Sequence, residues 1–204
     1  MHARLWVLAV GFAAAAFTAE AYVETPASLS ILVKESAVVV RGAVEAVSAE
    51  KKVVVLRVAT PVKGKTAYEK VKLDLSAAEG WQADAALRQA VVGTPVTLFY
   101  TVAENSDRAA FGLVYVHRLF LKAKAGEAAW TLLNLEVGMN KVFLGTPDEL
   151  AELVSRIVAG RAKAPAPHAW RPWTRESIEA LPPPPREGEP WPAFDPAAVF
   201  QAAK

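Results

Sequence analysis

Histidine is the side chain most often used for acid–base chemistry and metal binding near neutral pH, and this chain carries three. His2 lies in the apolar N-terminal segment, His117 in a run of β-forming residues and His168 in a proline-rich tail. A metal site needs at least three ligands at recognisable spacing, and these positions show no such spacing. We therefore interpret His117 as a strand residue with a satisfied ring, and we predict neither a metal site nor a cofactor.

Carboxylates and serines give no clearer catalytic pattern. Asp148, Glu149 and Glu152 fall in the first turns of an expected helix, where they complement the helix dipole. Three serines have no identifiable base partner: Ser36, Ser48 and Ser76. No nucleophile elbow, Walker loop, dinucleotide-binding glycine pattern or H-E-x-x-H motif occurs. The sequence thus predicts no catalytic residue, although groups that assemble only in space leave enzymatic activity an open question.

Aromatic residues concentrate in the later strands and permit two interpretations. They are Phe99, Tyr100, Tyr115, Phe120 and Trp130. One interpretation is an aromatic platform for a polymer or a peptide, next to the loops Ser48–Lys52 and Glu104–Ala110. The other is core packing, which the alternation of a strand imposes on half of its side chains, and we favour it.

The last forty residues hold ten of the fourteen prolines and three of the six tryptophans. Such a segment is too rich in proline to form its own core, yet a plain disordered tail rarely carries so many large aromatic residues. Four of them are candidate partner-docking residues: Trp170, Trp173, Trp191 and Phe194. The tail either wraps its own barrel or docks on a partner protein. We favour self-docking of Trp170 and Trp173, with a freer segment after Pro182.

The remaining elements follow from hydrophobic periodicity. Strands are expected at 38–47, 53–62, 69–75, 95–103, 111–122 and 128–136. A short helix is expected within 25–37, a second within 76–95 that ends at Gly93-Thr94-Pro95, and a third from the cap Thr146 to the terminator Gly160. Short tail helices are expected after Thr174 and from Asp195.

This order of elements predicts a mainly β fold with flanking helices. It matches a small, antiparallel, OB-like barrel, five-stranded and partly open, with a Pro/Trp-rich C-terminal extension. Gly42 lies inside the first valine-rich strand, where it permits a sharp bend or a bulge; the alternative is that it makes room for a bulky neighbour.

Several stretches resemble a known type of secreted OB barrel. They read "SAVVVRGAVEAV", "VVVLRVATPVKGK", "VKLDL" and "VGTPVTLFY", within residues 27–160. They resemble the netrin module and the tissue metalloprotease inhibitors, and also exported bacterial barrels that end in a "GTPDEL"-like helix. The inhibitors of that family act through an N-terminal cysteine, whereas this chain has no cysteine. The resemblance therefore implies the fold without the inhibitory mechanism.

The N-terminus has the three parts of a secretory signal. Arg4 provides a positive start, an apolar run extends to Phe17, and Ala19-Glu20-Ala21 is a cleavage motif. We expect residues 1–21 to be removed after about Ala21, leaving a barrel domain at 22–164 and an extension at 165–204. The predicted location is periplasmic or extracellular, with no membrane insertion after signal removal.

The composition excludes some classes of function but does not identify one. Lys and Arg total 23 against 21 Asp and Glu, which gives no electrostatic footprint for nucleic acid. The expected role is non-catalytic binding or scaffolding in the cell envelope, with another envelope protein or peptide as partner. The alternatives are a small hydrolase or enzyme accessory with a barrel-face cleft, and a protease inhibitor that acts through loops. The oligomeric state is left open.

Overall fold

A computed structural model describes residues 28–186 and 188–202. The predicted signal peptide and its cleavage site after Ala21 lie outside the described residues. In the part that is described, no helix has the length and apolar character required to cross a membrane.

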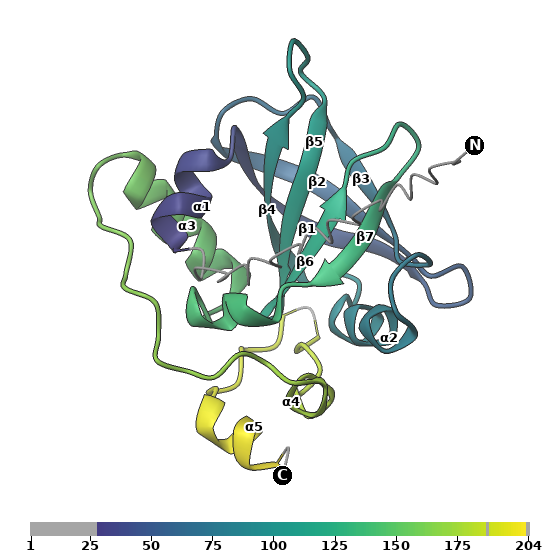
Figure 1. Cartoon of the computed structure of the whole chain (residues 1–204), viewed down its shortest axis with the longest axis vertical. Helices are drawn as coiled ribbons and strands as arrows, with labels where there is room; N and C mark the ends of the chain where they lie inside the picture. Colours follow the sequence, from purple (N-terminus) through teal and green to yellow (C-terminus); the bar gives the residue numbers. More distant parts are fainter. Residues whose placement is uncertain (1–27, 187, 203–204) are drawn as a thin grey trace, which may run out of the picture.

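Seven strands form a closed barrel in the order β1-β2-β3-β7-β6-β5-β4, with β4 paired back to β1 (Figure 1). Their bounds are β1 Val38–Ser48, β2 Val53–Lys63, β3 Lys70–Asp74, β4 Pro95–Val102, β5 Ala109–Val116, β6 Leu119–Lys124 and β7 Trp130–Leu135. All neighbours are antiparallel except β3 and β7, which run parallel. The mainly β architecture is confirmed, whereas the expectation of five strands and an open barrel is wrong.

The six expected strand ranges become seven strands because the range 111–122, expected as one strand, is a hairpin. Val116 pairs with Leu119, so only His117 and Arg118 form the turn between β5 and β6. Both have positive φ, 36° for His117 and 70° for Arg118. Hairpin turns of this kind normally use Asn or Gly, so a His-Arg pair gives no turn signal in the sequence. The expectation that His117 lies within a strand is therefore wrong.

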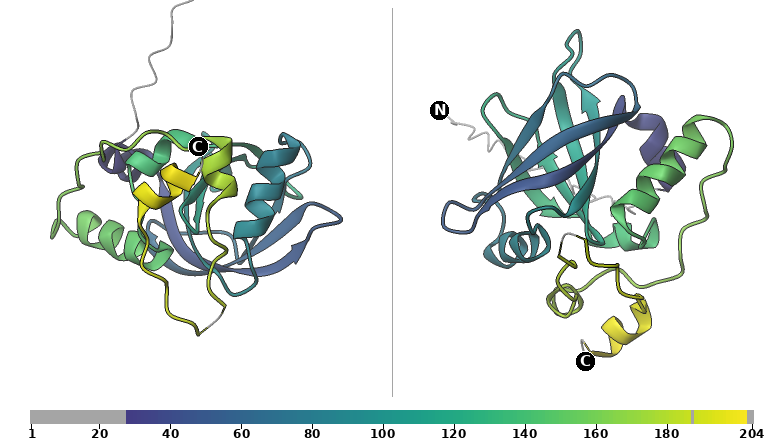
Figure 2. Two further views of the ribbon diagram at one scale, coloured as in Figure 1. Left: turned by 90° about the horizontal axis from the view of Figure 1, so that it is seen from below. Right: turned by 180° about the vertical axis from the view of Figure 1, so that it is seen from behind.

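The long β1–β2 pair crosses the back of the barrel (Figure 2, right). Its register shifts three times, and one shift falls between Arg41 and Gly42. A Cβ atom at Gly42 would lie 2.3 Å from the carbonyl oxygen of Arg57 on β2. Because backbone cannot yield as a flexible side chain does, only glycine fits there. The expected bulge at Gly42 is confirmed.

The barrel interior is apolar and ends in an aromatic cluster near the start of β5. The rings of Tyr68, Tyr100 and Trp130 meet edge to face, with centroids 5.7–5.8 Å apart. The Tyr68 hydroxyl accepts a 2.9 Å hydrogen bond from the Ala109 N–H. A Cβ at Gly112 would lie 2.1 Å from the Trp130 ring, so β5 leaves this space open for the indole.

A second apolar cluster lies outside the barrel, under α1 (Leu29–Glu35), the 3₁₀ helix η1 (Val137–Lys141) and α3 (Pro147–Val158). Phe99, Tyr115 and Phe120 belong to it and are at most 2 % exposed. Tyr100 and Trp130 of the inner cluster are equally buried, so the core interpretation of all five aromatic residues is confirmed. The helix α3 has the predicted Thr146 cap and the capping box with Glu149.

The remaining helices lie at the end of the barrel where β5 stops (Figures 1 and 2). They are α2 (Gly80–Gln89), α4 (Arg175–Glu179) and α5 (Pro196–Ala202). The helix α2 ends earlier than the expected Gly93-Thr94-Pro95, because Ala90 leaves helical geometry and a turn with Gly93 at φ 87° leads into β4. The Thr174 cap and the start of α5 after Asp195 are as predicted.

Candidate functional site

The tail lies across the end of its own barrel. Trp173 is only 4 % exposed, whereas Trp170, Trp191 and Phe194 are half-buried. The backbone N–H of Trp173 donates to the Val137 carbonyl at 2.9 Å, which fixes the tail to η1. The Asn140 side chain donates to the Arg171 carbonyl at 2.7 Å beside it.

The four candidate docking residues fall into two neighbouring groups. Trp173 stacks on Phe200 at 5.0 Å and meets Phe194 edge to face at 6.5 Å. Trp170 also stacks on Phe200, at 6.4 Å. Trp191 instead stacks on the ring of His117 at 5.2 Å. The structure thus brings all four residues to one end of the barrel, where their rings face the chain itself.

Under Trp191 and Phe194 lies a chain of three buried polar side chains that the sequence did not indicate. His117, Arg118 and Gln89 are at most 3 % exposed. Arg118 donates from a guanidinium nitrogen to His117 Nε2 at 2.8 Å, and His117 Nδ1 contacts Gln89 Oε1. A guanidinium has only donors, so Nε2 must accept, and the ring proton on Nδ1 therefore points to Gln89. The expected satisfied ring of His117 is confirmed.

The electrostatics of this chain hold His117 neutral. Burial is the larger cause and the Arg118 charge the smaller, and together they lower the pKa of His117 to about 3. Burial also lowers the pKa of Arg118, which nonetheless remains a cation. A neutral, enclosed imidazole that is already hydrogen-bonded at both nitrogens has no capacity to take a proton from a substrate at neutral pH.

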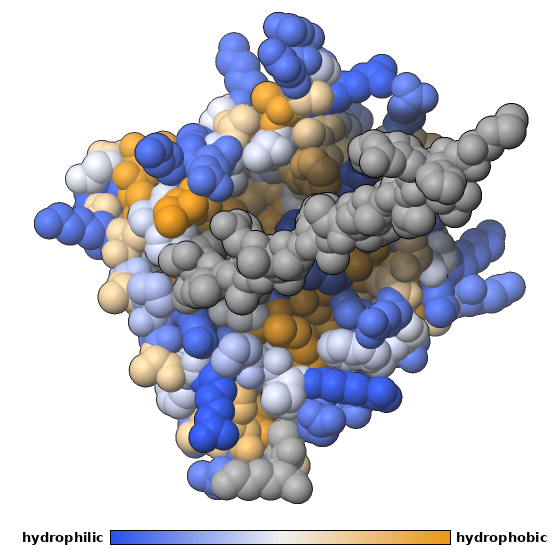
Figure 3. All heavy atoms as spheres, in the orientation of Figure 1, coloured by the Kyte–Doolittle hydropathy of each residue, from blue (hydrophilic) through white to orange (hydrophobic). Residues whose placement is uncertain are grey.

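A groove of about 730 Å³ is the second candidate site, on the outer face of β4 to β7 beside α1 and η1. One row of cross-strand neighbours forms its floor, in the order Phe99, Leu113, Lys122 and Asn134. The row is apolar at the β4 side and polar at the β7 side. Figure 3 shows apolar patches among polar side chains on this face of the molecule.

Charged groups stand along the polar side of the groove. Lys122 pairs with Glu136 at 3.2 Å, and the Asn134 amide donates to the same carboxylate at 3.3 Å. Lys141 and Glu35 also line the groove. The loops that the sequence suggested for ligand contact, Ser48–Lys52 and Glu104–Ala110, contribute nothing to its lining.

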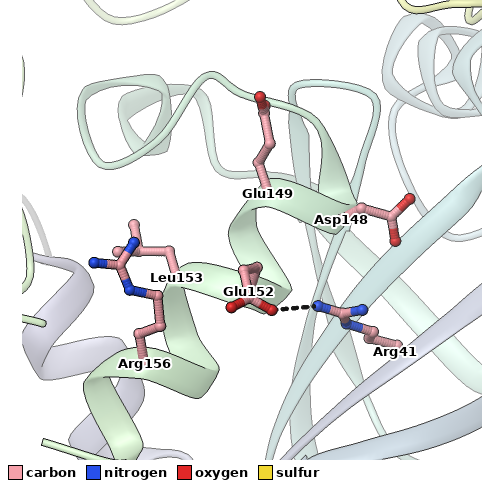
Figure 4. Close-up of a pocket in the computed structure, with 6 residues that line it drawn as sticks. All are labelled: Arg41, Asp148, Glu149, Glu152, Leu153 and Arg156. Carbon is pink, nitrogen blue, oxygen red and sulfur yellow. Dashed lines mark hydrogen bonds and ion pairs between the residues drawn. The ribbon is translucent and has the colours of Figure 1, made fainter. Parts of the chain in front are cut away.

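A shallow hollow over the start of α3 is the third candidate site (Figure 4). Arg41 of β1 contacts Glu152 at 3.4 Å, and both side chains are exposed to solvent. Glu149 accepts from the Thr146 N–H at 2.6 Å, so this carboxylate caps its own helix. An exposed ion pair and a capping carboxylate account for these charges without a ligand.

The serines are likewise engaged in local structure. The Ser36 hydroxyl donates to the Leu32 carbonyl at 2.7 Å, and Ser48 accepts from the Lys51 N–H at 3.3 Å. Ser76 donates through its N–H to Asp74 at 2.9 Å, and hydrogen bonds from Ser76 lower the pKa of that carboxyl. A carboxylate stabilised in this way is a poor general base. Among the described residues, no three metal-binding side chains gather closely enough to hold an ion.

Comparison with known proteins gives no relative: no protein-family model, no curated protein and no solved structure matches this chain. The groove and the tail-covered barrel end are therefore the two features whose geometry bears on function.

Proposed function

We propose that this chain is an exported, non-catalytic binding protein of the cell envelope, which holds an extended peptide segment of another envelope protein in the groove on β4 to β7. The observation that carries the proposal is the graded floor of that groove. It passes from buried Phe99 and half-buried Leu113 to exposed Lys122 and half-buried Asn134 within a single row across four strands.

Such a row suits a peptide with an apolar side chain on one side and polar groups on the other. The apolar side offers Leu113 and the 47 % exposed Phe111 as contact area. The polar side offers ammonium donors from Lys122 and Lys141, and carboxylate acceptors from Glu136 and Glu35. Backbone N–H and C=O groups of an extended segment need both kinds of partner. The volume of about 730 Å³ lies within the range of known ligand sites.

The finer fold assignment is also a proposal. A closed barrel with a helix between β3 and β4 supports an OB-like fold, and the valine-rich β1–β2 pair with its bulged glycine supports the likeness to netrin-type modules. The inhibitor mechanism of the metalloprotease inhibitors is not part of this proposal, because the chain has no cysteine.

The proposal is tested by selecting binders from a random peptide library displayed on phage, with the chain from residue 22 as bait. The wild type should enrich a motif that pairs an apolar residue with a charged one, and synthetic peptides should bind at about 1–100 µM in calorimetry. Phe111→Asp should weaken binding at least about tenfold, because it places a charge on the apolar side of the groove.

Leu133→Asp is the matched control, since Leu133 is a 43 % exposed apolar residue on β7, two strands away from Phe111 on β5, and does not line the groove. This variant should keep the wild-type affinity. If the selection enriches no motif, or if both variants bind the selected peptides equally well, the groove is not the binding site and the proposed function is wrong.

A further inference from the structure

Arg118 is a buried cation, only 3 % exposed, that forms no ion pair with a described residue. What lies against it is aromatic: its guanidinium carbon is 3.9 Å from the Phe194 centroid and 5.9 Å from that of Trp191. Burial lowers the pKa of Arg118 and the Glu149 charge acts in the opposite direction. Among the described residues, however, no carboxylate pairs with the guanidinium, and a buried charge without an ionic partner in contact is unusual.

The polar chain also has more donors than acceptors. Arg118 Nε and Gln89 Nε2 are buried and have no hydrogen-bond partner, although His117 between them is bonded at both ring nitrogens. Phe194 covers the face of the guanidinium, and that contact cannot satisfy the N–H groups in the plane of the group. These donors suit a hydrogen-bond acceptor, and beside a cation the acceptor that fits best is an anion.

The backbone that positions these side chains is strained. His117 and Arg118 both adopt positive φ, in a two-residue turn that Asn-Gly would form without strain. Backbone outliers of this kind persist when the surrounding structure over-determines them, and they cluster at ligand-binding sites. The turn presents Arg118 toward the tail, against the rings of Trp191 and Phe194.

We propose that Arg118 and Gln89 form a binding site for a carboxylate, which Phe194 and Trp191 cover until the ligand displaces them. One guanidinium charge is balanced by one carboxylate, and its planar N–H edge matches the two carboxylate oxygens. A phosphate dianion would leave a negative charge uncompensated in a buried place. This site is independent of the peptide groove, and its failure would leave the proposed function standing.

The covering segment, residues 190–195, is attached in a way that permits its displacement. Trp191 and Phe194 reach the site with their rings, while Pro190, Pro192 and Ala193 around them are exposed. Among the described residues, no backbone hydrogen bond joins 190–195 to the barrel. Displacement of this segment therefore breaks ring contacts but leaves the sheet intact.

The test follows the ¹⁵N-labelled Nε–H signal of Arg118 by NMR during titration with sodium acetate, at constant ionic strength maintained with chloride. Arg118→Lys assigns the signal by removing it. In Phe194→Ala we expect a saturable shift with an apparent Kd at least about tenfold lower than in the wild type, because the cover no longer competes. Gln89→Ala in the Phe194→Ala background should weaken acetate binding, and the same titration with phosphate should give the weaker response.

Amide spectra that match the wild type show that each variant is folded, and Trp191→Ala replaces Phe194→Ala if the latter is not. A folded, uncovered variant without a saturable shift would overturn the site, since water would then satisfy the unpaired donors. Equal affinity in the wild type and the uncovered variant would overturn the covering role. Tighter binding of phosphate would overturn the assignment to carboxylates.

Discussion

The two ends of β5 are closed by different means. Where the strand begins, Tyr68, Tyr100 and Trp130 fill the barrel with three rings that meet edge to face. Where it ends, a neutral histidine and an arginine that has no ion pair among the described residues occupy the turn, and aromatic rings from the distant tail cover them. The first closure is made within the barrel domain and the second joins two separate parts of the chain.

The rings at the first end therefore contribute to the stability of the whole barrel, whereas the rings at the second end determine how accessible the His117–Arg118 turn is. The rings at the start of β5 cannot leave without opening the barrel, because Trp130 is in a paired strand and its indole fills the space above Gly112. The rings at the other end are on the tail, where among the described residues no backbone hydrogen bond joins 190–195 to the barrel, so we expect the tail to detach while the sheet stays intact. A substitution at the first end should therefore act on global unfolding, whereas one at the second end should act mainly on docking of the tail.

Trp130→Ala should have the largest effect. The side chain is 2 % exposed, and its removal leaves a cavity among Tyr68, Tyr100 and Gly112. We expect the free energy of unfolding to fall by about 3–5 kcal/mol, which denaturant titration of the chain from residue 22 would measure. A loss below about 1 kcal/mol would show that this end is not the stabilising one.

The pH dependence of stability tests the polar end. The pKa of His117 is about 3 in the folded protein, against 6.5 for an unperturbed histidine. The unfolded chain therefore binds an extra proton between these values, and stability falls as the pH is lowered through 6.5 toward 3. Between pH 6.5 and pH 4 the contribution of this residue should fall by about 3 kcal/mol.

His117→Asn is the comparison for that measurement, because asparagine accepts the positive φ of the turn but does not titrate. The carboxylates are the same in both proteins, so the difference between the two pH curves isolates the histidine. Parallel curves over this range would show that the His117 ring is open to protonation in the folded protein.

Trp173→Ala should have a smaller effect than Trp130→Ala, although both indoles are almost fully buried. Once the tail detaches, further damage to it costs nothing, so the loss cannot exceed the free energy of docking. We expect about 2 kcal/mol, together with faster proteolytic cleavage near Pro165 and Pro167 and an intact barrel fragment. A loss as large as that of Trp130→Ala would show that the tail belongs to the cooperative core.

The sequence predicted those parts of the structure that depend on local chemistry. The α3 cap at Thr146, the bulge at Gly42 and the paired valine strands all follow from residues that lie close together along the chain. The buried aromatic residues follow from alternation within a strand. Such signals survive folding because tertiary contacts reinforce them.

The candidate sites could not be predicted in the same way. Gln89 is on α2 and meets His117 only in space, 28 residues away in sequence. The His-Arg turn lacks the residues that normally mark a hairpin. The groove depends on the register that aligns Leu113 with Lys122 and on η1, which no periodicity indicated. Long-range register and backbone conformation, rather than residue type, produced what the sequence analysis missed.

The smallest effects are expected from substitutions at two helix caps of the same kind. Thr146 caps α3 and Thr174 caps α4, each in a capping box with the residue three positions later. The α3 helix is anchored to the barrel, since Thr97 donates to the Pro147 carbonyl at 2.7 Å, so Thr146→Ala should lower the free energy of global unfolding by about 1 kcal/mol.

Thr174→Ala should lower the free energy of global unfolding by no more than about 0.5 kcal/mol, because a five-residue helix on a detachable tail contributes little to the barrel. Its effect should instead appear as faster proteolysis of the tail. Denaturant titration and limited proteolysis of the two variants, side by side, measure both quantities. Equal losses in the free energy of global unfolding would mean that the tail and the barrel unfold as one unit. The rings of Trp191 and Phe194 would then leave the barrel only when it unfolds, like the rings around Trp130.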